Sequence, residues 1–175
     1  IKIVGADGHE VEEGLPGELL VRGPNVMLGY YGQPELTAGA VDEQGYLKTG
    51  DIVSRNMSGE LVVQGRSKEL IIRSGFNVYP PEIEAVLNTH PTVLNSAVVG
   101  RSVEGNEEII AFVEPVPGGS IETNDLFTFL EGQLARYKKP QQIIVMQQLP
   151  VAPNGKIRKH DLKKYAEASA LSLSV

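Results

Sequence analysis

The apolar residues in the first part of the chain fall in short runs that glycines bound. GELLVRG (17–23) and GELVVQG (59–65) both have this form, which is typical of short strands that end in turns. Between them, PELTAGAV (34–41) predicts one or two turns of helix. Strands of this kind predict a small β-barrel or sheet.

After Gly65 the pattern changes to a mixture of strands and helices. Residues 68–80 predict two strands joined by a turn at Ser74 and Gly75. Residues 80–90 predict a helix, because proline costs no hydrogen bond in a first turn and the apolar residues recur on one face. Further strands are expected at 95–100, 107–116 and 141–146, and further helices at 123–137, with Thr123 as the N-cap, and at about 158–168.

These elements predict the α+β fold class and two domains. Residues 1–66 are expected to form the small β-barrel-like subdomain. Residues 67–168 are expected to form an α+β domain of about 100 residues, which is large enough to bury its own core. Residues 169–175 are expected to be a flexible tail.

Composition narrows the class of protein. Of the 175 residues, 41% are hydrophobic and 22% are charged, which is typical of globular domains. No apolar run approaches the ~20 residues that span a bilayer, and the opening IKIVGADGHE has no signal-peptide pattern. The chain also lacks an initiator methionine, so we expect a fragment of a longer protein. The absence of cysteine excludes disulfides and thiolate ligands, predicts no metal site of that kind and fits a cytoplasmic location.

The net charge of −6 argues against a nucleic-acid partner, but the charge is unevenly distributed. Eight of the 16 lysines and arginines lie between Arg136 and Lys164, where Asp161 is the only acidic residue. A basic segment on an acidic protein points to an anionic small ligand or a partner surface. A solvated helix face is the alternative interpretation.

Two stretches before residue 70 carry candidate chemistry. GYLKTGD (45–51) places Asp51 after Gly50, where a fixed carboxylate could accept both hydroxyls of a ribose; an ordinary turn is the alternative. Arg66 and Lys68 lie where the two predicted domains join, and a junction needs only a few residues whose backbone angles can change. The alternative there is a pair of solvated linker cations.

Two stretches nearer the C-terminus also combine cations with rigid or aromatic residues. In LPVAPNGKIRK (149–159), Asn-Gly favours a tight hairpin turn and Pro153 stiffens the approach to it. Such a turn would hold Lys156 at a projecting tip. ARYKKP (135–140) places a tyrosine among cations, and its alternative interpretation is a helix C-terminus with favourable positive charge.

In this order, the stretches resemble those of the adenylate-forming superfamily of acyl-CoA synthetases, luciferases and peptide-synthetase adenylation domains. The resemblance is carried by Tyr46 to Asp51, Gly65 to Glu84 and Pro150 to Lys156, and extends from Gly17 to about Tyr165. It covers about the C-terminal third of such an enzyme. It implies that residues 1–66 are the last β subdomain of a large N-terminal domain and that residues 67–168 are the C-terminal lid domain.

The resemblance also implies roles for four residues in nucleotide chemistry. Asp51 would hold the ribose hydroxyls of ATP or AMP, and Arg66 would contact the ribose and phosphates. Lys68 would be the hinge between the large domain and the lid. Lys156 would bridge the carboxylate substrate and the α-phosphate during adenylation.

Four further residues would serve the second half-reaction, the transfer to CoA. Ser74 and Gly75 would line the passage for the pantetheine arm, and Tyr137 and Lys139 would lie near the CoA nucleotide. The stretch 65–84 resembles acyl-CoA synthetases that act on fatty or aromatic acids, whereas peptide-synthetase domains usually carry an acid at the hinge. Lys48 and Leu47 are mild departures from the family pattern.

The implied whole protein is an ATP-dependent, AMP-forming acyl-CoA synthetase with CoA as co-substrate. Its phosphate loop, its acyl pocket and most of its Mg²⁺ site would belong to the missing N-terminal domain, so the fragment alone is expected to be inactive. Two alternatives remain: an adenylating relative that does not use CoA, either luciferase-like or loading a carrier protein, and a non-catalytic interaction module. The presence of Asp51, Arg66 and Lys156 argues against the second.

Overall fold

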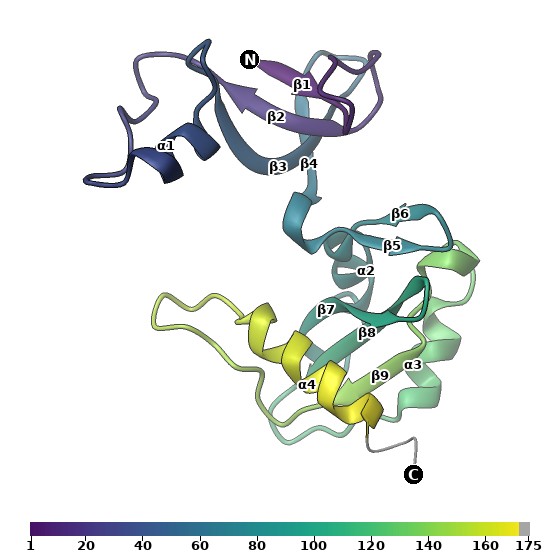
Figure 1. The fold of residues 1–175 in the computed structure, drawn as a ribbon. Coiled ribbons are helices and arrows are strands. Elements are labelled where there is room, and N and C mark those ends of the chain that lie inside the picture. Colours follow the sequence, from purple (N-terminus) through teal and green to yellow (C-terminus); the bar gives the residue numbers. More distant parts are fainter. Residues whose placement is uncertain (172–175) are drawn as a thin grey trace. The chain divides into compact units, whose positions relative to one another are not determined.

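The computed structural model describes residues 1–171, which form two compact units (Figure 1). The first unit is Ile1–Lys68 and the second begins at Glu69. This boundary lies two residues past the division that the sequence predicts. No helix in residues 1–171 has both the length and the apolar character needed to cross a membrane.

The first unit is an open four-stranded antiparallel sheet with one short helix. The strand order is β1-β2-β3-β4, so β1 and β4 are free edges and the described residues form no closed barrel. The barrel-like prediction is therefore corrected to an open sheet. Its elements are β1 (Lys2–Val4), β2 (Gly17–Val21), α1 (Pro34–Ala40), β3 (Leu47–Arg55) and β4 (Leu61–Arg66).

The second unit combines a hairpin, a three-stranded sheet and three helices. In the sheet, β8 lies between β7, which is antiparallel to it, and β9, which is parallel to it. The strands are β5 (Ile71–Arg73), β6 (Phe76–Val78), β7 (Val93–Val103), β8 (Asn106–Pro115) and β9 (Gln142–Val145). The helices are α2 (Pro80–Leu87), α3 (Thr123–Leu130) and α4 (Lys159–Leu171), with short 3-10 turns at Ser67–Glu69, across the unit boundary, and at Arg136–Lys138.

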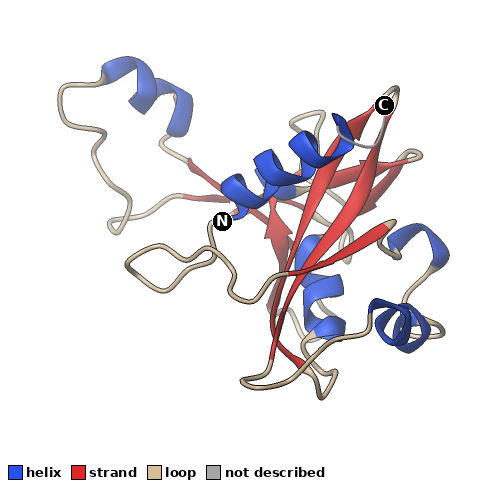
Figure 2. Cartoon of the chain, turned by 90° about the horizontal axis from the view of Figure 1, so that it is seen from below, coloured by secondary structure: helices blue, strands red, loops and turns tan. Residues whose placement is uncertain are grey.

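The core of the second unit lies on both faces of this sheet. Alternate residues of a strand point to opposite faces, so Ile109 and Ala111 pack with α2 and α3, whereas Ile110 and Phe112 pack with α4. In Figure 2 the long C-terminal helix lies along one face of the three strands and the shorter helices of this unit lie on the other. Burial on both faces explains the unbroken apolar run of β8. The α+β fold class is confirmed.

Several predicted boundaries differ from the structure. The helix expected over 123–137 ends at Leu130, and Gly132 takes a φ of +81° just beyond it. Thr123 is the first helical residue, while Glu122 occupies the N-cap position without a side-chain cap, so the predicted Thr123 cap is wrong. The last helix continues to Leu171. Residues 169–171 of the predicted tail are therefore helical, and 172–175 lie outside the described residues.

Candidate functional site

Strand β3 is irregular where the first candidate motif lies. The pairing register between β2 and β3 shifts between Glu18 and Leu20, and the extra residues on β3 include Thr49 and Gly50. Gly50 has a φ of +74°, a left-handed conformation that glycine adopts without a steric penalty. Such bulges re-aim neighbouring side chains and are over-represented next to active sites.

The side chain of Thr49 fixes the bulge. Its hydroxyl donates to the carbonyl of Leu19 at 2.8 Å and accepts the backbone N–H of Asp51 at 3.1 Å. Asp51 thus lies within β3, and not in the ordinary turn that is the alternative interpretation of residues 45–51. Its backbone position is set by hydrogen bonds on both sides of the bulge.

Asp51 and Arg66 form an ion pair across β3 and β4. The two residues are direct partners in the strand register, and Arg66 Nε lies 2.8 Å from Asp51 Oδ1. Arg66 Nη1 also donates to the carbonyl of Thr49 at 3.3 Å. The side chains are 30% and 59% exposed, respectively. An ion pair this exposed adds little to stability, and both groups remain accessible to a ligand.

Lys68 lies in the 3-10 turn that spans the unit boundary. Its side chain is exposed, and it forms no ion pair with any residue in the described part of the chain. The neighbouring Glu69 is different, because its Oε2 lies 2.7 Å from Lys159 Nζ within the second unit.

The β5–β6 hairpin turns at Ser74 and Gly75, as predicted. Both residues have positive φ, +50° and +82°, and both are exposed. The aromatic ring of Phe76 stacks on that of Tyr137, with ring centroids 4.6 Å apart. This stacking places the predicted Ser74–Gly75 turn beside the predicted Tyr137.

Arg73 joins the same hairpin to the backbone around Tyr137 and Lys139. Its Nη1 donates to the carbonyls of these two residues at 3.0 and 2.7 Å. Lys138, between them, contacts both carboxylate oxygens of Glu82 at 2.6 and 2.7 Å. Partial burial disfavours the charged amine and by itself would lower the pKa of Lys138. The hydrogen bond to Glu82 and the negative charge of Glu82 have a larger effect, so the pKa is raised. The four residues predicted to serve CoA therefore lie in one region of the second unit.

Lys156 follows a tight turn, as the sequence predicts. The N–H of Gly155 donates to the carbonyl of Ala152 at 2.8 Å, and the N–H of Ala152 donates to the carbonyl of Lys156 at 2.8 Å. Gly155 has a φ of +79°, and Asn154 Oδ1 accepts the backbone N–H of Lys156 at 3.2 Å. The Lys156 side chain is exposed, and among residues 1–171 it has no ion-pair partner.

The base of this hairpin is held by Lys159, the first residue of α4. Lys159 Nζ lies 2.7 Å from Glu69 and 2.8 Å from Glu84, and Glu84 also accepts the backbone N–H of Val98 at 2.7 Å. Burial disfavours the charged amine and by itself would lower the pKa of Lys159. The negative charge of Glu84 and the hydrogen bonds that Lys159 donates to both glutamates have a larger effect, so the pKa is raised. We refer to Lys159, Glu69 and Glu84 as the Lys159 cluster.

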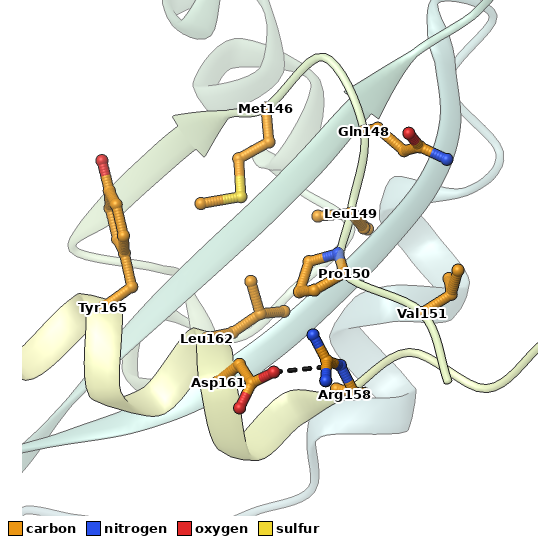
Figure 3. Close-up of a pocket in the computed structure, with 9 residues that line it drawn as sticks. All are labelled: Met146, Gln148, Leu149, Pro150, Val151, Arg158, Asp161, Leu162 and Tyr165. Carbon is orange, nitrogen blue, oxygen red and sulfur yellow. Dashed lines mark ion pairs between the residues drawn. The ribbon is translucent and has the colours of Figure 1, made fainter. Parts of the chain in front are cut away.

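A shallow groove of about 500 Å³ lies between residues 146–151 and α4 (Figure 3). Its floor is apolar, with Leu149 and Leu162 buried in the core, and the Arg158–Asp161 ion pair of 3.0 Å lies at its side. None of the predicted site residues lines it. Within the described residues, no group of three or more histidine, aspartate or glutamate side chains could hold a metal ion.

The comparisons with known proteins show which family the chain is similar to. Residues 82–156 match the family described as the AMP-binding enzyme C-terminal domain. The chain is also 42% identical over 165 residues to indoleacetate–CoA ligase of Aromatoleum aromaticum, which covers 94% of this chain and 32% of that protein. This chain carries the AMP-binding enzyme C-terminal domain. The predicted family membership is thereby confirmed.

Other known proteins match over a similar length. The mitochondrial medium-chain acyl-CoA ligase ACSF2 of Macaca fascicularis is 38% identical over 91% of this chain and 26% of its own length. The crystal structure of ATP-bound MatB from Rhodopseudomonas palustris is similar with a TM-score of 0.86 and 34% identity, over 94% of this chain and 33% of that chain. The chain thus spans about a third or less of the length of these proteins.

Sequence reasoning did not find several residues that shape the site. In the sequence, Lys159 stands out only as one cation of the basic segment. Its partners Glu69 and Glu84 are too distant in sequence to indicate a cluster. The sequence pattern around Arg73 and Phe76 predicts only strands. No sequence signal pointed to Asn106, which contacts the Ser74 backbone at 2.7 Å.

Proposed function

We propose that this chain is the C-terminal third of an ATP-dependent, AMP-forming acyl-CoA synthetase. The whole enzyme would activate a fatty or aromatic acid as an acyl-adenylate and transfer the acyl group to CoA. The observation that carries this proposal is the exposed Lys156 on a tight, anchored hairpin, in a chain similar to named CoA ligases over nearly its whole length. ATP, Mg²⁺ and CoA are the implied cofactors.

Lys156 is assigned to the first half-reaction. Joining a carboxylate to the α-phosphate brings two anions together, so charge repulsion opposes the reaction. A fixed cation at the meeting point lowers this barrier, and it acts more strongly where water is excluded. The amine of Lys156 suits this role because it has no ion-pair partner among the described residues to give up.

Asp51 and Arg66 are assigned to the nucleotide. The Asp51 carboxylate can accept hydrogen bonds from two ribose hydroxyls, and the Arg66 guanidinium can donate to ribose and phosphate oxygens. Their mutual ion pair of 2.8 Å keeps both side chains oriented before a nucleotide binds. The described residues offer no cluster that fits Mg²⁺, so we assign that ion to the N-terminal domain of the whole enzyme.

The hairpin and the segment around Tyr137 are assigned to the second half-reaction. Ser74 and Gly75 would line the pantetheine passage, and Tyr137 and Lys139 would lie near the CoA nucleotide. The contacts of Arg73 and Phe76 support a common role because they join the two segments. Between the two steps, movement of the lid about Lys68 would withdraw Lys156 from the reacting groups and bring the hairpin and the segment around Tyr137 to them. A cytoplasmic location and the absence of a nucleic-acid partner remain predictions.

The test of the proposal is an assay of the full-length protein with ATP, Mg²⁺, CoA and a panel of fatty and aromatic acids. We expect acyl-CoA, AMP and pyrophosphate as products for at least one acid. Formation of acyl-adenylate without acyl-CoA would instead support the relative that does not use CoA. If no acid releases pyrophosphate or forms acyl-adenylate, the interaction-module alternative replaces the enzyme.

The hinge role of Lys68 gives a separate prediction for the full-length enzyme. Proline fixes φ near −65°, which matches the 3-10 geometry of the Ser67–Glu69 turn. Lys68→Pro should therefore favour one lid position and slow one half-reaction about tenfold more than the other. Pyrophosphate exchange and thioester formation from supplied acyl-adenylate measure the two steps separately.

Lys68→Ala is the matched control for this prediction, because it removes the same charge without restricting the backbone. It should leave the ratio of the two rates unchanged. Equal effects of proline on both steps would remove the hinge assignment.

A further inference from the structure

The tip of the β5–β6 hairpin contains an unusual backbone conformation. Ser74 has a φ of +50°, and it is the one non-glycine residue with positive φ among residues 1–171. Side chains other than glycine rarely adopt this left-handed region, because it brings Cβ close to backbone atoms. Such conformations persist where surrounding contacts impose them, and they cluster at functional sites.

Asn106 forms hydrogen bonds with Ser74. It is the first residue of β8, and its Oδ1 accepts the backbone N–H of Ser74 at 2.7 Å. Its Nδ2 lies 3.5 Å from the Ser74 hydroxyl, at the limit of a hydrogen bond. Asn106 also pairs with Val103 in the β7–β8 register, so its backbone belongs to the central sheet of the second unit.

The remaining contacts of the hairpin hold its strands, not its tip. Glu107 Oε2 accepts the backbone N–H of Ile72 at 2.7 Å, and Arg73 and Phe76 contact the segment around Tyr137. Among the side-chain hydrogen bonds of residues 1–171, those of Asn106 are the ones that reach Ser74. The strands would therefore keep their place without Asn106, while the turn between them would lose its fixed geometry.

We propose that Asn106 is a positioning residue for the transfer of the acyl group to CoA. Its side-chain amide holds Ser74 in the left-handed conformation and thereby fixes the turn assigned to the pantetheine passage. Asn106 acts through Ser74 and has no contact with CoA in this role. The inference rests on the function proposed above, because it concerns only the second half-reaction.

The test uses the full-length enzyme and measures the two half-reactions separately. Asn106→Ala should slow single-turnover thioester formation from supplied acyl-adenylate and CoA about five- to tenfold, the effect of losing one ordering hydrogen bond. Pyrophosphate exchange should stay within about twofold of wild type, which also shows that the variant is folded. Asn106→Asp retains an oxygen acceptor at the same place and should recover most of the thioester rate.

A second background separates positioning of Ser74 from general loss of structure. Glycine adopts positive φ without strain, so in a Ser74→Gly enzyme the further change Asn106→Ala should slow thioester formation by less than about twofold. The same loss in both backgrounds, or equal loss in both half-reactions, overturns the proposal for Asn106. If the wild-type enzyme is active and its Asn106→Ala variant is unaffected, only the proposal for Asn106 is overturned. If the wild-type enzyme forms no acyl-CoA, the proposed function is overturned as well.

Discussion

Replacing Lys156 with alanine in the full-length enzyme is expected to slow acyl-adenylate formation about 10²–10³-fold, the typical effect of losing one preorganised group that stabilises transition-state charge. Thioester formation from supplied acyl-adenylate should stay near the wild-type rate, because the two anions have already been joined before that step. The exposed position of Lys156 means that the substitution leaves no cavity in the core. The expected split between the steps is thus a chemical effect and not a loss of folding.

Pyrophosphate exchange measures the first step, and single-turnover thioester formation measures the second. Lys164→Ala is the matched control, since Lys164 is also exposed and has no ion-pair partner among the described residues. It should change neither rate. Equal loss of both half-reactions in Lys156→Ala would contradict the role assigned to this amine.

Replacing Lys159 with methionine is expected to destabilise the second unit by about 2 kcal/mol. Removing one partner of a buried ion pair typically costs 3–5 kcal/mol, and the side chains of Lys159, Glu69 and Glu84 are 22%, 37% and 16% exposed, so solvent reduces the value. Methionine retains the apolar stem of lysine while leaving two carboxylates without their cation. The main loss is therefore electrostatic.

Urea unfolding of the 175-residue chain measures this change. The chain has six tyrosines and no tryptophan, so far-UV circular dichroism and tyrosine fluorescence are suitable probes. Lys164→Met on the same helix is the control and should stay within about 0.5 kcal/mol of wild type. A Lys159→Met variant as stable as this control would show that the Lys159 cluster contributes nothing measurable.

The pH dependence of the same measurement has a definite sign. The pKa of Lys159 is raised in the folded protein above its ordinary value of 10.5. The cation therefore contributes its full stabilisation below about pH 10 and loses it as the pH rises through the folded-state pKa. The stability difference between wild type and Lys159→Met should be constant from pH 7 to about pH 9 and shrink at more alkaline pH.

Local patterns in the sequence predicted most of the second unit. The Ser74–Gly75 turn, the strands that became β7 and β8 and the proline-initiated α2 follow from residues close together in sequence. β3 was harder to predict, because the bulge at Thr49 and Gly50 breaks the alternation on which strand prediction depends. The residue pattern therefore predicts no strand over Leu47–Arg55, where the structure has β3.

The contacts that organise the candidate site could not be predicted in the same way. Glu69 and Lys159 are 90 residues apart, and Arg73 lies 64 residues from Tyr137. Local periodicity holds no information about such pairs. The positive φ of Ser74 could not be predicted from the sequence either, because glycine is the residue that usually adopts this left-handed conformation.

The ion pair between Glu69 and Lys159 also affects how the second unit folds during translation. Glu69 is the first residue of this unit, and Lys159 is the first residue of α4. A nascent chain that does not yet include α4 therefore lacks the cation that pairs with Glu69 and Glu84. The early segments can form their local structure in the meantime. The unit acquires its closing electrostatic contact only when α4 leaves the ribosome, and until then the segment next to Lys68 is held less firmly.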